Sequence, residues 1–298
     1  MLRDKFSKYL QSERNYSENT RIAYLNDLDN LAGFIEENLG WSIFEEKGAA
    51  KTDHRQLRSW MGTLLESGVS KRTVSRKLAA ASTYFKFLRK SGLVENNPVA
   101  RFTAPKFEKK LPSFLREEDA LNLFEKVTFE DNWEGKRDRA MIEVLYGCGL
   151  RRAELINLAY KNIDFTGQTI KVMGKGRRER VLPFGSNMRS AMLDYRNLCE
   201  KEGINFRDTF FVNANSEPLD PRKVYSMVRK AISQVSSVSK KSPHVLRHTF
   251  ATHLLNAGAD LNAIKELLGH KSLAATQVYV HNSIAKLKSV YKKAHPKA

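Results

Sequence analysis

The chain contains very little cysteine: Cys148 and Cys199 are the only two among 298 residues. Two thiols cannot form a disulfide framework or a cysteine metal cage, which favours a reducing compartment. The sequence also lacks any apolar run close to the roughly 20 residues that span a bilayer. Its first residues are charged from Arg3 onward and contain no apolar signal-peptide core. These absences predict a cytoplasmic protein that makes no use of a membrane.

Acidic residues are also few relative to basic ones, with 33 Asp and Glu against 51 Lys and Arg. The formal charge of +18 and the pI near 9.8 favour a polyanionic partner, because binding it releases counterions and relieves self-repulsion. Charge alone leaves four alternatives open: double-stranded DNA, RNA, an acidic lipid surface, or a basic surface of no specific purpose. Only the arrangement of residues can separate them.

Several cofactor signatures are missing as well. The turn Gly174-Lys175-Gly176 lacks the spacing of a phosphate-binding loop, and no GxSxG nucleophile elbow occurs. His244 and His248 stand four residues apart, as zinc ligands on a helix do, but no glutamate follows the first histidine. We therefore expect neither a cofactor nor a metal.

A proline-rich segment divides the chain into two domains. Residues 97–112 hold three of the eight prolines and show little periodicity, which predicts a linker between domains at 1–96 and 113–298. Four cations around this linker favour a strap along phosphates rather than a free spacer. They are Arg101, Lys106, Lys109 and Lys110.

The N-terminal domain is predicted to be a helical bundle. Ser17, Ser70 and either Thr52 or Asp53 are candidate N-caps, and apolar residues recur at helical spacing after each. The helix after Ser70 has a second face of cations and small side chains, with Lys71, Arg72, Ser75 and Arg76 near its start. Such a face suits close approach to a DNA major groove, and the alternative is an ordinary solvated surface.

The C-terminal domain is predicted to be mostly helical with one β interruption. A helix is expected over 116–127, and a hairpin pairs 162–165 with 168–172 around a turn at Thr166-Gly167. A third strand is expected over 179–182. The fold class is therefore mainly α: a helical bundle, then a mostly helical domain with a small three-stranded antiparallel sheet.

Chemically versatile side chains stand in compact contexts of the C-terminal domain. In chain order they are Arg151, Glu154, Lys175, His244, Arg247, His270 and Tyr279. Arg151 follows a glycine-bracketed turn at a helix start, and His244 and Arg247 lie three apart on one helical face. Singly, each has an ordinary structural explanation, such as an Arg151–Glu154 ion pair or a core position for Tyr279.

Taken together, these motifs resemble the tyrosine recombinase (phage integrase-like) family, and most closely its Xer branch. The resemblance covers nearly the whole chain, and the motifs follow one another in the family's order. They are Ser17-Glu18-Asn19-Thr20, Ala23-Tyr24, Asp27-Leu28, Asn97-Pro98, Leu111-Pro112, Arg137-Asp138-Arg139-Ala140, Tyr146-Gly147-Cys148-Gly149-Leu150-Arg151, Gly174-Lys175-Gly176, Pro243 with HVLRHTFATH over 244–253, Leu267-Leu268-Gly269-His270 and His295-Pro296. The resemblance implies a SAM-like core-binding domain and a catalytic domain that cleaves and rejoins DNA.

The resemblance also implies a role for each chemical residue. Arg151 and Arg247 match the two catalytic arginines, and Tyr279 matches the nucleophile that forms a 3'-phosphotyrosyl link. A β-hairpin lysine, two histidines and a supporting acid complete the set: Lys175, His244, His270 and Glu154. Arg152 adds a second cation beside Arg151, but the Gly-Leu-Arg context favours Arg151.

Physical chemistry explains why this set needs no metal. A phosphodiester under attack gathers negative charge on its non-bridging oxygens, which two guanidiniums can stabilise. A phenol with a pKa near 10 is a poor nucleophile at neutral pH, so neighbouring cations and a histidine acceptor would activate Tyr279. Lys175 is the candidate general acid for the departing 5'-oxygen. The covalent link preserves the phosphoester for a second transfer.

Assembly and biological role follow from the resemblance alone. It implies a homo- or hetero-tetramer with a related recombinase on double-stranded DNA, a nucleoid location and the resolution of chromosome dimers. It also implies a septal DNA translocase as a further partner, and a helix at 282–291 that docks on a neighbouring protomer. The alternatives are an integrase or transposase of a mobile element, a relaxing topoisomerase, or a DNA-binding protein without catalysis.

Overall fold

The computed structural model describes residues 1–102, 113–174, 179–206 and 208–269. The chain divides into two compact units, Met1–Lys110 and Leu111–Ala298. Each unit has its own hydrophobic core. Among the described helices, none has the length and hydropathy that crossing a bilayer requires.

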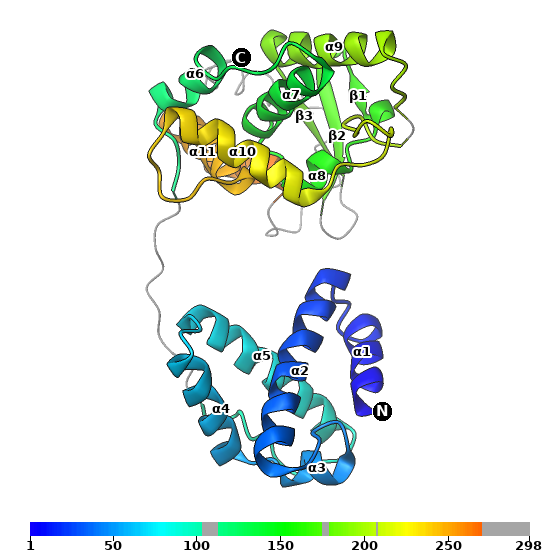
Figure 1. Ribbon diagram of the computed structural model, residues 1–298, viewed down its shortest axis with the longest axis vertical. Helices are drawn as coiled ribbons and strands as arrows, with labels where there is room; N and C mark the ends of the chain where they lie inside the picture. The colour runs from blue at the N-terminus through cyan, green and yellow to red at the C-terminus, as the bar shows by residue number, and fades with distance from the viewer. Residues whose placement is uncertain (103–112, 175–178, 207, 270–298) are drawn as a thin grey trace. The chain divides into compact units, whose positions relative to one another are not determined.

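The N-terminal unit is a helical bundle, as predicted (Figure 1). Its described helices are α1 (Leu2–Ser12), α2 (Glu18–Leu39), α3 (Glu46–Lys51), α4 (His54–Glu66) and α5 (Lys71–Lys90). Ser17 caps α2 and Ser70 caps α5 by accepting backbone N–H groups. Of the two candidates for α4, Asp53 is the cap, and its carboxylate accepts the Arg55 N–H at 2.6 Å.

The apolar stripe of α5 lies in the core of this bundle. Val74, Leu78, Ala81, Phe85 and Leu88 are all buried, which confirms the predicted helical spacing. The opposite edge of α5 therefore faces outward, and Lys71 and Arg72 at its start are exposed.

The C-terminal unit surrounds a small sheet with helices (Figure 1). In chain order its described elements are α6 (Glu117–Glu125), α7 (Trp133–Gly147), α8 (Arg152–Ile156), the 3-10 helix η1 (Tyr160–Asn162), β1 (Ile163–Asp164), β2 (Thr169–Met173), β3 (Glu179–Pro183), α9 (Ser186–Lys201), α10 (Pro221–Val235), α11 (Pro243–Asn256) and α12 (Leu261–Leu268). Helix α7 packs against α8, α9 and α11. Its residues from Ala140 onward are all buried, so α7 forms the centre of the core.

The three strands form an antiparallel sheet in the order β1-β2-β3. The register pairs Ile163 with Ile170 and Met173 with Glu179. The predicted hairpin turn is wrong in its extent: residues 165–168 form the turn, and Gln168 has a φ of 50° instead of extended geometry. Asp164 explains the wider turn, because its Oδ1 accepts the N–H groups of both Thr166 and Gly167.

Leu115, just after the linker, is fixed to α11 by buried hydrogen bonds. Its N–H donates to Thr249 Oγ1, and its carbonyl lies 2.9 Å from His253 Nε2. A carbonyl only accepts, so Nε2 carries the proton and Nδ1 accepts the Tyr146 hydroxyl at 3.0 Å. One polar network thus joins the start of the unit to α7 and α11. Helix α11 also carries His244 and Arg247.

Candidate active site

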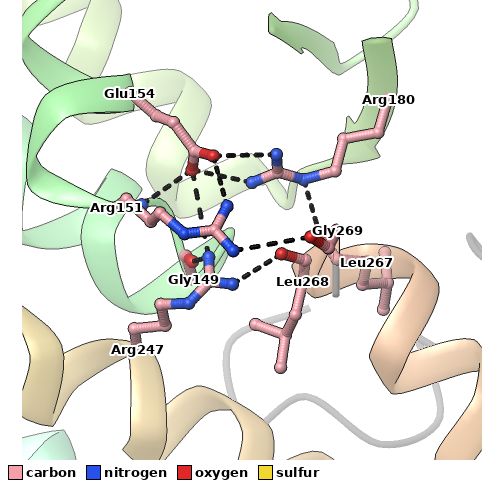
Figure 2. Close-up of polar contacts among 8 residues, drawn as sticks. All are labelled: Gly149, Arg151, Glu154, Arg180, Arg247, Leu267, Leu268 and Gly269. Atoms are coloured by element: carbon pink, nitrogen blue, oxygen red, sulfur yellow. Dashed lines mark hydrogen bonds and ion pairs between the residues drawn. The ribbon is translucent and has the colours of Figure 1, made fainter. Parts of the chain in front are cut away.

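One buried carboxylate, that of Glu154, organises the polar centre of the C-terminal unit (Figure 2). Arg151 donates to it twice, from its backbone N–H at 2.8 Å and from its guanidinium at 2.7 Å. Arg180 adds a fork of two bonds, at 3.0 and 2.8 Å. Arg247 lies 3.9 Å away as a third cation. Glu154 therefore holds arginines from three separate segments around one point.

Arg151 owes its position to the sharp turn that joins α7 to α8. Gly149 in this turn has a φ of +58°, a left-handed conformation that favours glycine. A Cβ at this residue would also stand 2.5 Å from the Phe250 ring. Arg151 follows as the N-cap of α8, as the sequence predicted, with Glu154 in the first turn of that helix.

Arg247 joins this turn to the end of α12. Its guanidinium donates to Gly149 O at 2.6 Å and to Leu268 O at 2.5 Å. Arg180 donates from Nε to Leu267 O at 2.8 Å, and Arg151 reaches Gly269 O at 3.4 Å. Three consecutive carbonyls thus accept from three different arginines (Figure 2). This arrangement suits the C-terminal end of a helix, whose dipole attracts cations.

The electrostatics of the cluster leave a surplus of positive charge. Burial raises the pKa of Glu154. The hydrogen bonds and charge of Arg180, with hydrogen bonds from the Arg151 backbone and side chain, outweigh this effect and hold the pKa at about 2. Burial and the neighbouring Arg151 lower the pKa of Arg247 to about 10, which still leaves it charged at neutral pH. Three cations therefore face one anion, and an added anion would be attracted to them.

The three guanidiniums differ in their access to such an anion. The Arg151 side chain is 32% exposed, whereas those of Arg180 and Arg247 are both 9% exposed. Each terminal nitrogen of Arg247 donates one hydrogen bond to a backbone carbonyl. The guanidinium has five N–H groups, so further N–H groups remain for another acceptor. Arg151 and Arg247 are therefore the better placed pair for contacting an anion.

His244 lies at the start of α11, one turn before Arg247, as the spacing predicted. Burial lowers its pKa, and the charges of Arg247, Arg152 and Arg151 lower it further. At neutral pH the imidazole is therefore uncharged, and one ring nitrogen is available as a proton acceptor.

Three of the predicted catalytic residues lie outside the described residues: Lys175, His270 and Tyr279. The structure brings together Arg151, Glu154 and Arg247, with His244 nearby. Within the described ranges no three His, Cys, Asp or Glu side chains form a metal-binding group. Sequence reasoning placed Arg180 on the third strand but missed its part in the site. Its proximity to Lys175 in a predicted hairpin was the one available signal.

The predicted groove-facing residues all lie on α5 of the N-terminal unit. Lys71 and Arg72 are exposed at its start, and Ser75 Oγ donates to the Lys71 carbonyl at 2.9 Å. Arg76 pairs with Asp27 on α2. The C-terminal unit has a basic helix that the sequence analysis did not single out. Helix α10 exposes four cations: Arg222, Lys223, Arg229 and Lys230.

Comparison with known proteins identifies both units. Residues 113–286 match the model of the phage integrase family, and residues 4–92 match the N-terminal SAM-like domain of phage integrases. The chain belongs to the phage integrase family. It is thus a tyrosine recombinase, an enzyme that cleaves and rejoins DNA. This confirms the predicted family, fold class and enzyme class.

Individual relatives agree with this assignment. The chain is 41% identical over 293 residues to tyrosine recombinase XerC of Pelobacter propionicus, covering 98% of this chain and 94% of the relative. It is 37% identical over 297 residues to XerC of Bacillus subtilis, covering 98% and 95%. XerH recombinase in a post-cleavage complex with difH shares the fold at 22% identity and a TM-score of 0.71, covering 96% of this chain and 83% of that chain.

Proposed function

We propose that this phage integrase family member is a site-specific recombinase that resolves chromosome dimers, with Tyr279 as the nucleophile. The observation that carries the assignment of residues is the cluster around Glu154. It brings together the part-exposed guanidinium of Arg151 and the buried guanidinium of Arg247, and leaves a surplus of positive charge there. The chain then continues from Gly269 to His270 and, nine residues on, to Tyr279. The XerC names of its relatives support the role in chromosome dimer resolution.

The scissile phosphate would bind between Arg151 and Arg247. Arg151 offers the more exposed guanidinium, and Arg247 is fixed by two carbonyls so that its remaining N–H groups point in a set direction. Both would fork onto non-bridging oxygens, where charge grows as the phenol attacks. Donors that are already held in place need little reorganisation during the reaction.

Proton transfers would involve histidine and lysine side chains. Neutral His244 lies one turn from Arg247 and can accept a proton or donate a hydrogen bond to a phosphate oxygen. His270 and Lys175 are the further candidates, with Lys175 delivering a proton to the leaving 5'-oxygen. Attack by Tyr279 forms the 3'-phosphotyrosyl bond as the 5'-oxygen bond breaks. A 5'-hydroxyl of the partner duplex then attacks the phosphotyrosyl phosphorus, which forms the new phosphodiester and releases the Tyr279 phenol.

Recognition of the duplex would use basic faces of both units. Lys71, Arg72 and Ser75 on α5 are the proposed contacts of the N-terminal unit, whereas Arg76, which the sequence also predicted as a contact, pairs with Asp27 in the unbound protein. The exposed cations of α10 are the corresponding candidates of the C-terminal unit. Phosphate contacts of this kind supply affinity and position the protein, and base contacts add the sequence preference.

Recombination joins two duplexes, so the active species would be a tetramer on DNA. One solved relative in fold is described as a lambda integrase tetramer bound to a Holliday junction, at 20% identity and a TM-score of 0.66. A partner recombinase or four copies of this chain would complete the assembly, in the cytoplasm at the nucleoid. A septal DNA translocase would be a further partner that activates one of the recombinases.

Covalent trapping in cells tests the proposed function. Cells that express the protein are lysed under denaturing conditions, the protein is purified, and the attached DNA is sequenced. We expect the DNA attached to the unmodified protein to be enriched in one discrete chromosomal site. Tyr279→Phe should lose that enrichment. Tyr225→Phe, at an exposed tyrosine of α10, is the matched control and should retain adducts. Adducts that persist in Tyr279→Phe would overturn the assignment.

A further inference from the structure

Arg180 is the most fully engaged of the three arginines, because all three nitrogens of its guanidinium donate to the protein. Nε donates to Leu267 O, and the two terminal nitrogens donate to the two oxygens of Glu154. Its side chain is as buried as that of Arg247. Unlike Arg151, it is therefore poorly placed to contact a phosphate directly.

The fold uses Arg180 to join three segments that are distant in sequence. The residue lies on β3, where it pairs with Val172, and the next pair, Met173 with Glu179, brackets the connection that contains Lys175. Through Glu154 it contacts the acid that fixes Arg151. Through Leu267 O it contacts the end of α12, from which the chain continues to His270.

The close contact with α12 depends on a glycine. Gly269 ends that helix with a φ of +61°, and a Cβ there would stand 3.2 Å from the terminal nitrogen of Arg180. The left-handed conformation and the small side chain both let the guanidinium lie against the end of the helix. Arg180 and Gly269 therefore form one contact between β3 and α12.

We propose that Arg180 is a positioning residue for DNA cleavage. It locks the end of α12 and strand β3 to the Glu154–Arg151 pair, and so sets the position of Arg151 relative to the helix end at Leu267. This inference rests on the proposed function, because it assumes that Arg151 binds the scissile phosphate. Arg180 itself touches neither DNA nor the reacting atoms in this role.

The test compares Arg180→Gln, Arg180→Lys and a control, Arg189→Gln. Arg189 also donates to a backbone carbonyl, that of Phe165 at 2.9 Å, but it stands on α9. Each full-length protein is incubated in excess with a nicked duplex that carries the site found by covalent trapping. The rate of adduct formation in a single turnover and the affinity for the intact duplex are measured separately.

We expect Arg180→Gln to slow adduct formation at least tenfold while affinity for the duplex changes less than threefold. Arg180→Lys should recover part of the rate, because it keeps the charge without the fork. The pH profile gives a second readout, which is taken over the pH range in which circular dichroism shows each variant to be folded. Without Arg180 the pKa of Glu154 rises, so the rate should fall off at a higher pH on the acidic side than in the unmodified protein.

A double variant tests whether Arg180 acts through Glu154. Glu154→Gln with Arg180→Gln should be no slower than the slower single variant, because both remove the same coupling. Arg180→Gln that cleaves at the unmodified rate, or additive losses with an unchanged pH profile, would overturn the positioning role. If the unmodified protein forms no adduct at any site, the proposed function fails instead, so the two failures are distinct.

Discussion

Arg76 on α5 forms an ion pair with Asp27 on α2, a carboxylate that is only 3% exposed. Lys77 approaches the same carboxylate at 3.4 Å. A buried charge of this kind requires compensation, so the pair holds α5 against α2. Arg76 is 46% exposed and was predicted to contact DNA, but in the unbound protein its guanidinium is already engaged.

This ion pair separates the roles of two cations on one helix. Lys71→Gln should weaken DNA binding at all sequences and reduce the slope of log affinity against log salt by about one. Arg76→Gln should leave that slope nearly unchanged but destabilise the N-terminal unit by about 1 kcal/mol, because Asp27 loses one of its two partners. Salt-dependent binding and urea unfolding measure the two effects. A full unit of slope lost in Arg76→Gln with unchanged stability would show that Arg76 binds DNA directly.

Gly149 allows a second matched comparison. Gly149→Ala should destabilise the C-terminal unit by about 2–4 kcal/mol, since it combines left-handed backbone strain with the Phe250 clash. Gly203→Ala is the control, because Gly203 also has a positive φ, of 71°, but nothing within 4 Å of the added Cβ. It should cost about 1 kcal/mol from the backbone alone. Equal losses of unfolding free energy in urea would show that the contact with Phe250 has no effect.

Local features of the fold were predictable because they depend on neighbouring residues. Ser17 and Ser70 cap the helices that follow them, and Arg151 begins α8, as spacing and residue type indicated. The turn at Gln168 was not predictable in this way, since the sequence indicated a two-residue turn at Thr166-Gly167. The Asp164 side chain decides that turn, and its effect is visible only once the hydrogen bonds are known.

The assembly of the site was predictable only through the family resemblance. Glu154 lies 26 residues from Arg180 and Gly269 lies 118 from Arg151. No periodicity links positions so far apart, and an arginine on a strand ordinarily faces solvent. Arg180 was therefore missed, although Arg151, Glu154 and Arg247 were found. The ion pair between Arg76 and the buried Asp27 was missed for the same reason.

The polar network at Leu115 should contribute to stability through a single hydroxyl. Thr249→Val removes the acceptor of the buried Leu115 N–H and should destabilise the C-terminal unit by about 1–3 kcal/mol. Thr249→Ser keeps the hydroxyl and loses only a methyl group, so it should cost about 1 kcal/mol. Thermal unfolding of the full-length variants compares the two. A serine variant that is no more stable than the valine variant would exclude the hydrogen bond as the cause.

The titration of His244 reports the positive charge of the site. Its pKa lies below the ordinary 6.5, first because of burial and then because of Arg247, Arg152 and Arg151. The imidazole therefore stays neutral as the pH falls through 6.5 and becomes charged only at lower pH. Arg152→Gln removes one repelling cation, so the pKa should rise toward 6.5.

Nuclear magnetic resonance of the imidazole nitrogens during a pH titration measures this shift in the DNA-free protein. Arg229→Gln on α10 serves as the control, since Arg229 is not among the charges that lower the pKa of His244. A pKa that stays constant in Arg152→Gln would mean that the charge of Arg152 does not contribute to the lowered pKa of His244. A rise confined to Arg152→Gln would show that the cations hold the imidazole in its proton-accepting form, ready for a phosphate whose negative charge would reverse their effect.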